Sequence, residues 1–220
     1  MTLRVLQVDA ALRREHYYLE DGDDCYYIGD YISRGGYDAG PINNLISNLK
    51  KSVEKRGRPE YRYKELAIRK ATEMLQEVLN PDALAGITFM PIPPSKCKAD
   101  PLHDDRLCQI LRGVNPALDT RDVLSAKVTK KAHRDYAAGE KRPTPDEVYA
   151  NLALDTFAIG HAPLRPHVIL FDDVLTAGTH FKACKRILLE HRPELTISGL
   201  FIGRTKRPAI DFADEFEDDF

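Results

Sequence analysis

One stretch of this chain, residues 167–182, constrains its fold more than any other. It contains four consecutive apolar residues, Val168 to Phe171, which have the length and composition of a strand buried in a parallel sheet. Two carboxylates, Asp172 and Asp173, come directly afterwards, and a short turn at 176–179 follows. The apolar residues of the next segment recur at helical spacing, at Phe181, Cys184, Ile187 and Leu188. The sequence therefore predicts a strand, a tight turn and a helix in direct succession.

This succession can bind an anion. A turn between a buried strand and a helix directs backbone N–H groups towards a negative charge, and Gly178 permits the positive φ angle and close approach that such a turn needs. The carboxylates of Asp172 and Asp173 suit a ligand with hydroxyl groups. We therefore expect a sugar phosphate, with its phosphate in the turn and its ribose diol on the two acids. The alternative is an ordinary turn flanked by surface acids.

The segment from Val168 to His180 resembles the phosphoribosyl-pyrophosphate motif of type I phosphoribosyltransferases. That motif has four apolar residues, two acids, two apolar residues, two hydroxyl residues, glycine, any residue and threonine. Ala177 and His180 depart from it, and each departure removes a hydroxyl group that could hold the 5′-phosphate. The Ala177 N–H would remain, and the His180 ring could donate instead. The resemblance implies that phosphoribosyl pyrophosphate contacts Asp172, Asp173, Thr176, Ala177, Gly178, Thr179 and His180. It also implies a catalytic role for Asp172 and Asp173, which would hold the ribose diol and the positive charge that grows on the sugar.

A second segment, residues 86–96, predicts the other half of a site. Ile87 to Met90 has the composition of a buried strand, and the prolines that follow force the chain out of the sheet. The run Met90 to Lys96 resembles the Pro-x-Pro loop of ComF-like phosphoribosyltransferases, which implies that Ser95 and Lys96 bind pyrophosphate. A helix is expected to open at Asp100–Pro101. The resemblance matches Arg106 on that helix to a pyrophosphate-binding arginine of the family, although the usual Arg-Gly-Phe-Asn run is absent. The alternatives are a surface position for Lys96 and, for Arg106, pairing with a neighbour such as Asp104 or Asp105.

Residues 127–142 are rich in charge, with six Lys or Arg residues against Asp135 and Glu140. Type I enzymes have a mobile loop in the corresponding position, which closes over the reacting sugar. The resemblance implies that this loop neutralises the departing pyrophosphate, with Lys130 and Arg134 as catalytic candidates beside Lys131 and His133. A surface loop without a catalytic role has the same sequence character.

We expect an α/β fold of the type I phosphoribosyltransferase, Rossmann-like kind: a parallel sheet with flanking helices and a small N-terminal β hood. The single domain spans 1–210, with the hood at 1–40, a helical pair at 41–85 and the core at 86–205. Within the hood Tyr27 and Tyr31, together with Tyr26, could stack on a base, or could instead cover the core. The expected helices of the pair begin at Pro41 and near Tyr63, and a last core strand spans 195–202.

Composition narrows the class of protein further. The formal net charge is −2, so the chain lacks the global basic signature of nucleic-acid binding. The four cysteines are widely spaced, which disfavours zinc or a disulfide framework and suggests a cytoplasmic location. No run is apolar enough for a membrane span. The tail, 211–220, is acidic with a phenylalanine every fourth residue, so it could dock on a protein partner or simply solubilise the chain.

The resemblance implies a phosphoribosyltransferase that transfers ribose 5-phosphate from phosphoribosyl pyrophosphate to a nitrogenous base. Mg²⁺ would bridge the pyrophosphate and the ribose hydroxyls, with no ligand directly from the protein. Its partners would be that substrate and a base, and it could form a homodimer. The alternatives are a non-catalytic binder that senses phosphoribosyl pyrophosphate or nucleotides, and an effector subunit of a larger complex that acts on nucleotides.

Overall fold

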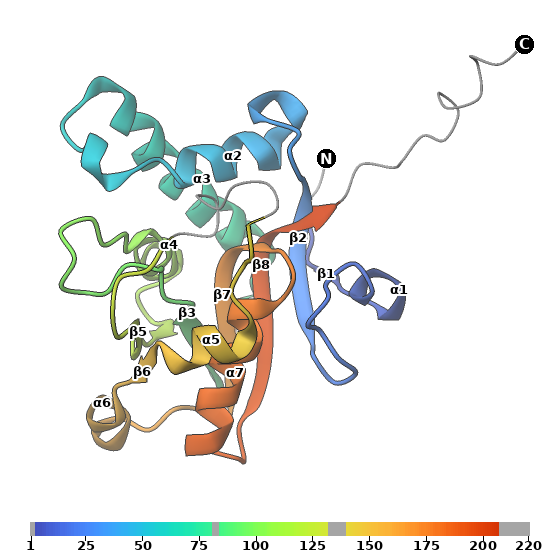
Figure 1. The fold of residues 1–220 in the computed structure, drawn as a ribbon, viewed down its shortest axis with the longest axis vertical. Coiled ribbons are helices and arrows are strands. Elements are labelled where there is room, and N and C mark those ends of the chain that lie inside the picture. The colour runs from blue at the N-terminus through green and yellow to red at the C-terminus, as the bar shows by residue number, and fades with distance from the viewer. Residues whose placement is uncertain (1–2, 81–83, 132–139, 207–220) are drawn as a thin grey trace, which may run out of the picture.

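The computed structural model describes residues 3–80, 84–131 and 140–206 (Figure 1). Its centre is a six-stranded sheet in the order β1-β2-β8-β7-β3-β4. The strands are β1 (Leu6–Gln7), β2 (Cys25–Ile32), β3 (Ile87–Pro91), β4 (Asp119–Thr120), β7 (His167–Leu175) and β8 (Thr196–Lys206). Only β1 pairs antiparallel with its neighbour, and the remaining pairs are parallel. The fold is therefore α/β with a mostly parallel sheet, as expected.

Helices cover both faces of this sheet (Figure 1). One face carries α2 (Pro41–Leu49), α3 (Arg62–Val78) and α4 (Arg106–Val114), and the other carries α7 (Thr179–His191) with α5 (Pro145–Ala150) packed beside it. Smaller elements are α1 (Ala10–Arg13), α6 (Thr156–His161), the 3-10 turns η1 (Tyr37–Ala39), η2 (Val53–Lys55) and η3 (Pro59–Tyr61), and a two-stranded sheet of β5 (Leu124–Ala126) and β6 (Leu152–Leu154). None of the helices in the described ranges is long and apolar enough to cross a membrane.

The apolar run of β7 is divided between two hydrophobic cores. Val168 and Leu170 join the core under α7, whereas Ile169 and Phe171 join the core under α2, α3 and α4. This division follows from the two-residue period of a strand, because successive side chains point to opposite faces. A strand that is apolar on both faces requires helices on both sides, which is the arrangement observed.

The N-terminal segment differs from the expectation. Residues 1–40 were expected to form a β hood outside the core sheet, but β2 pairs in parallel with β8 from Cys25–Gly199 to Ile32–Lys206, and β1 pairs with β2. Both strands are thus part of the main sheet. The physical reason is burial, since Cys25 and Ile28 of β2 contribute to the two cores that the sheet separates.

Several elements follow their expected bounds closely. The helices α2 and α3 form the expected pair over 41–85, and β3, β7 and β8 occur where strands were expected. However, β7 continues through Asp173 to Leu175, and β8 continues beyond the expected end at 202 to Lys206, because its residues pair with β2 and β7 there. The helix expected at Asp100–Pro101 instead begins at Arg106. Asp100 accepts hydrogen bonds from the Leu102 N–H and the Thr129 hydroxyl, so it closes a turn and ties down a neighbouring loop.

Candidate functional site

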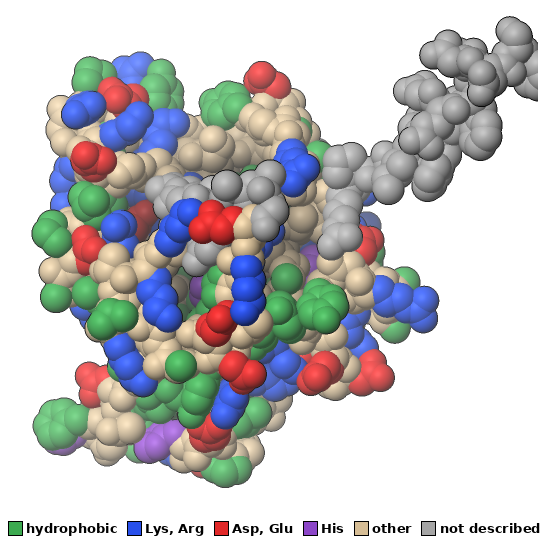
Figure 2. All heavy atoms as spheres, in the orientation of Figure 1, with side chains coloured by type: hydrophobic (Ala, Val, Ile, Leu, Met, Phe, Trp, Pro, Cys, Tyr) green, Lys and Arg blue, Asp and Glu red, His purple; other side chains and the backbone are tan. Residues whose placement is uncertain are grey.

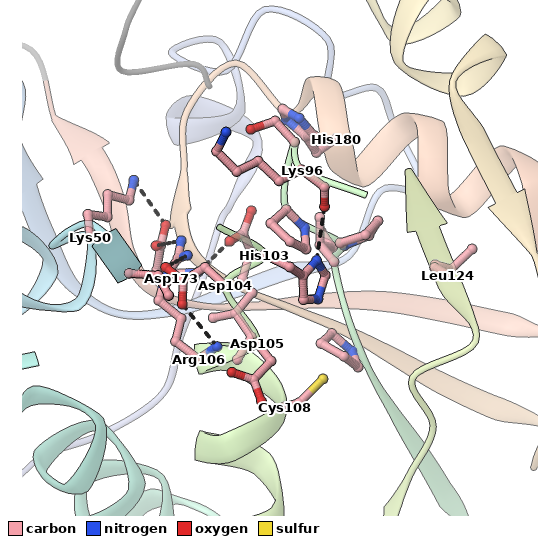
Figure 3. Close-up of a pocket in the computed structure, with 18 of the residues that line it drawn as sticks. Lys50, Lys96, His103, Asp104, Asp105, Arg106, Cys108, Leu124, Asp173 and His180 are labelled. Carbon is pink, nitrogen blue, oxygen red and sulfur yellow. Dashed lines mark hydrogen bonds and ion pairs between the residues drawn. The ribbon is translucent and has the colours of Figure 1, made fainter. Parts of the chain in front are cut away.

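The carboxyl ends of β3 and β7 lie side by side, because these neighbouring strands run parallel and Pro91 pairs with Phe171. In a sheet of this kind, ligands bind in the crevice beyond the carboxyl ends of the strands. A cavity of about 200 Å³ opens at this edge. The lining residues that matter below come from five segments: Lys50; Ser95 and Lys96; His103, Asp104 and Arg106; Lys131; and Asp172, Asp173, Thr176 and His180 (Figure 3).

The turn after β7 has the backbone conformation that the sequence predicts. Gly178 adopts the left-handed conformation, with φ of 85°, and α7 begins at the next residue. The first-turn N–H groups of an α-helix have no acceptor within the helix, and they carry the positive end of its dipole. Thr176 and His180, on either side of Gly178, line the cavity. The described structure thus brings a helix N-terminus to the edge of the cavity.

Asp172 and Asp173 have different environments, although they are adjacent in sequence. Because both lie within β7, the strand alternation sends their side chains to opposite faces of the sheet. Asp173 points to the face that carries α2 and α4, and its residue is only 3 % exposed. Asp172 points to the face of α7, where its charge raises the pKa of the buried Cys184 thiol, after the larger effect of burial.

Asp173 is held by two cations that the sequence did not connect to it (Figure 3). One carboxylate oxygen accepts a hydrogen bond of 2.6 Å from Arg106 Nη2, and the other lies 3.1 Å from Lys50 Nζ. Arg106 also donates to Asp104 at 2.9 Å, and Asp104 in turn accepts from the buried Lys64 at 2.7 Å. This chain of charges joins β7 to α2, α3 and α4 beneath the cavity.

The network separates the acidities of the two carboxyl groups. Although burial favours the neutral acid, Lys50 and Arg106 hold the pKa of Asp173 well below its usual range. Burial raises the pKa of Asp172 to about 7, and the adjacent charge of Asp173 adds to this effect. Burial lowers the pKa of His180, and the charge of Lys50 lowers it further, so this ring is neutral at pH 7. Asp173 is therefore an anion that is already paired, while Asp172 titrates near neutrality.

The loop after β3 reaches the cavity with both of its predicted residues. Ser95 and Lys96 line it, and Lys96 Nζ lies 3.7 Å from Asp100. The Lys96 carbonyl oxygen accepts a hydrogen bond of 3.0 Å from His103 Nδ1, and the Ser95 carbonyl oxygen accepts one of 2.8 Å from the Lys130 N–H. The backbone of the expected catalytic loop thus begins directly against this loop.

The remaining predicted residues differ in where the structure places them. Lys130 is exposed and its side chain is not among the lining residues, whereas Lys131 lines the cavity and pairs with Glu140 at 2.6 Å. His133 and Arg134 lie outside the described residues, as does the tail at 211–220. Arg106 reaches the cavity, but its guanidinium is engaged by Asp104 and Asp173.

The tyrosines of the N-terminal segment are not brought to the site. Tyr27 is buried in the core under α7, and Arg204 lies over its ring at 5.2 Å. Tyr26 packs against the opposite core, and Tyr31 is not among the residues that line the cavity. Because β2 is an internal strand of the main sheet, its side chains cover the core, which was the alternative considered for them.

Sequence reasoning missed Lys50 and His103, whereas Asp104 was considered only as an ion-pair partner of Arg106, a pair that the structure contains. Lys50 is one of seven basic residues between 50 and 64, a run that predicts either a solvated loop or a surface that contacts nucleic acid or phosphate. Figure 2 shows Lys and Arg side chains gathered over this connection between α2 and α3. Only one signal could have singled out Lys50, namely its place directly after the last apolar residue of α2, where a helix end meets the sheet edge.

Among the described residues, no group of three or more His, Cys, Asp or Glu side chains is arranged to hold a metal ion. A scan against protein-family models matches no family, and a search of curated proteins finds no match to this sequence.

Proposed function

We propose that this protein is a phosphoribosyltransferase, which transfers ribose 5-phosphate from phosphoribosyl pyrophosphate to a nitrogenous base and releases pyrophosphate. The observation that carries the proposal is the meeting of two anion-binding elements across one cavity. The turn at 176–179 and the helix start after it supply N–H groups on one side, and the loop with Ser95 and Lys96 supplies a cation on the other. The carboxylate of Asp172 lies at the same edge.

This arrangement matches a ligand with two phosphate groups separated by a sugar. The 5′-phosphate would take the N–H groups of the turn and a hydrogen bond from the neutral His180 ring, in place of the missing hydroxyls. The pyrophosphate would face Lys96 and Lys131. Asp172 would accept the ribose hydroxyls, because Asp173 already has a cation on each oxygen.

The proposed catalysis is mainly positioning and charge stabilisation. As pyrophosphate leaves C1, positive charge develops on the sugar and negative charge on the leaving group. Asp172 would stabilise the first and the lysines the second. Asp173 would act indirectly, by keeping Arg106 and Lys50 in place beneath the site.

Mg²⁺ belongs to this proposal as an ion that comes with the substrate. A hard cation prefers oxygen ligands and keeps several waters, so the substrate oxygens together with water form a suitable set. When bound, Mg²⁺ would neutralise charge on the pyrophosphate. The described residues offer no cluster that would hold it without substrate.

One observation favours a second candidate, a non-catalytic sensor of phosphoribosyl pyrophosphate or nucleotides. The network around Asp173 leaves Asp172 as the carboxylate available to a ribose, and Ala177 and His180 remove hydroxyl groups from the turn. A site weakened in this way could bind the ligand without turning it over.

Calorimetric titration with phosphoribosyl pyrophosphate and Mg²⁺ tests the shared part of both candidates. We expect the wild type to bind and Asp172→Asn to lose binding, while the matched variant Asp105→Asn, at another lining acid, binds as the wild type does. If the folded wild type binds no phosphorylated ribose, both candidates fail.

A further inference from the structure

The segment at 15–24, between α1 and β2, packs against the turn at 176–179 from outside the site. Of the described residues that line the cavity, none comes from this segment. It nevertheless contacts three successive residues of the turn. The His16 ring bonds the Thr176 carbonyl oxygen, the Tyr18 N–H bonds the Ala177 carbonyl oxygen at 2.9 Å, and Leu19 lies against Gly178.

These contacts determine the direction of two N–H groups. The described peptide bonds are trans, and in a planar trans peptide the C=O and the N–H point in opposite directions. The N–H that shares a peptide with the Thr176 carbonyl belongs to Ala177, and the one that shares a peptide with the Ala177 carbonyl belongs to Gly178. Because both carbonyl groups point towards the segment, the N–H groups of Ala177 and Gly178 point away from it.

The hydrogen bond of His16 also fixes its tautomer. A carbonyl oxygen can only accept, so Nδ1 must carry the proton and donate it. The side chain is 1 % exposed, so water cannot readily replace this donor.

The rest of the segment is attached firmly to α7. Lys182 pairs with Glu20 at 2.7 Å and with Asp23 at 2.8 Å, and Lys185 pairs with Asp23 at 2.7 Å. Asp23 is 3 % exposed; burial favours its neutral form, but the hydrogen bonds from the two lysines lower its pKa below the usual value. A Cβ on Gly178 would lie 2.8 Å from Leu19 Cδ2, so segment and turn are in close contact.

We infer that residues 15–24 position the phosphate-binding turn, with His16 as the positioning side chain that holds the N–H groups of Ala177 and Gly178 towards a phosphate monoester. The inference rests on the proposed function, because it concerns the same phosphate site. It also explains how a turn that has alanine at a hydroxyl position can keep its affinity: fixed backbone donors cost no reorganisation when the phosphate binds.

The test compares two partial ligands, ribose 5-phosphate and pyrophosphate with Mg²⁺, by calorimetry. We expect His16→Ala to weaken ribose 5-phosphate binding about ten-fold, the effect of one hydrogen bond to a charged group, and to leave pyrophosphate binding unchanged. His16→Asn should restore most of the affinity, because its amide can donate in place of Nδ1. Tyr17→Ala, at a side chain 81 % exposed in the same segment, is the control for both ligands.

A second readout does not depend on any ligand. In the NMR spectrum of the free protein, the amide resonances of Ala177 and Gly178 should shift in His16→Ala and return towards the wild-type positions in His16→Asn. Unchanged amide resonances, or an equal loss of affinity for both ligands, would overturn the inference. If the amides shift but the wild type binds neither ligand, the positioning contact stands and the proposed function fails.

Discussion

Replacing the two adjacent acids of β7 one at a time should have opposite consequences. Asp173→Asn removes the anion from a buried network and leaves Arg106 and Lys50 without their shared partner. Asp172→Asn removes a carboxylate that burial and the charge of Asp173 already drive towards its neutral form. Asp173→Asn should destabilise the fold. Asp172→Asn should abolish the proposed ligand binding while the fold keeps its stability.

The size of the stability loss in Asp173→Asn depends on the partners that Arg106 and Lys50 keep. Removing one member of a buried ion pair costs roughly 3–5 kcal/mol. Arg106 keeps Asp104 at 2.9 Å, and the Lys50 side chain is 31 % exposed and can turn towards water. We therefore expect a loss near the lower end, about 3 kcal/mol, for Asp173→Asn. For Asp172→Asn we expect no loss in unfolding free energy at pH 7.5. We expect a gain at any pH at which Asp172 is ionised in the wild type, because the substitution then removes repulsion between the two carboxylates.

Urea unfolding followed by circular dichroism measures both changes, since the chain has no tryptophan and its helices give a strong signal. The wild type and both variants should have equal slopes, so that a shift in midpoint reports a change in the free energy of unfolding. The assignment of Asp173 as the buried, ion-paired acid would be wrong if Asp172→Asn were the more destabilised variant, or if the two variants lost equal stability.

Three further predictions concern the turn, the titration of the site and the thiols. Gly178→Ala should lower the free energy of unfolding by about 1–3 kcal/mol. The loss should exceed that of Gly22→Ala, because both glycines have φ of 85° but, of the two, only Gly178 has a neighbour close to the added Cβ. Equal losses in the two variants would exclude the close contact. Because the pKa of Asp172 is raised from 3.8 to about 7, the native state binds a proton between these pH values that the unfolded chain releases. The free energy of unfolding of the wild type, relative to that of Asp172→Asn, should therefore fall as pH rises through this range. A difference in unfolding free energy that does not change with pH would contradict the raised pKa. The hydrogen bond from Thr129 lowers the pKa of Cys97, whereas burial raises the pKa of the other three cysteines. One thiol should therefore react with a disulfide reagent in the native protein, and none should react in Cys97→Ser. Rapid reaction of a second thiol would show that a buried cysteine becomes accessible in the native protein.

Local patterns predicted much of the framework, because the elements around the site have strong periodicity. The helices α2 and α3 and the strand–turn–helix of β7 and α7 all appear where the spacing of apolar residues indicated them. The pairing of β2 with β8 could not be read in this way, because it joins distant segments, and the alternation of β2 suits a hairpin as well as a sheet strand.

The candidate site was predicted only where local sequence features form it. The turn and the loop at Ser95–Lys96 are local features, and both reach the cavity. The different environments of Asp172 and Asp173 depend on whether β7 ends before or after them. The sequence does not mark the end of a strand when polar residues continue it. The pairing of Lys50 and Arg106 with Asp173 depends on tertiary packing, which no local pattern encodes.

Release of pyrophosphate from phosphoribosyl pyrophosphate, in the presence of Mg²⁺ and a panel of purine and pyrimidine bases, distinguishes a transferase from a sensor. We expect release that depends on one class of base in the wild type, and no release in Asp172→Asn. Absence of release with every base, from wild-type protein shown to bind the substrate, would contradict the transferase and leave the sensor.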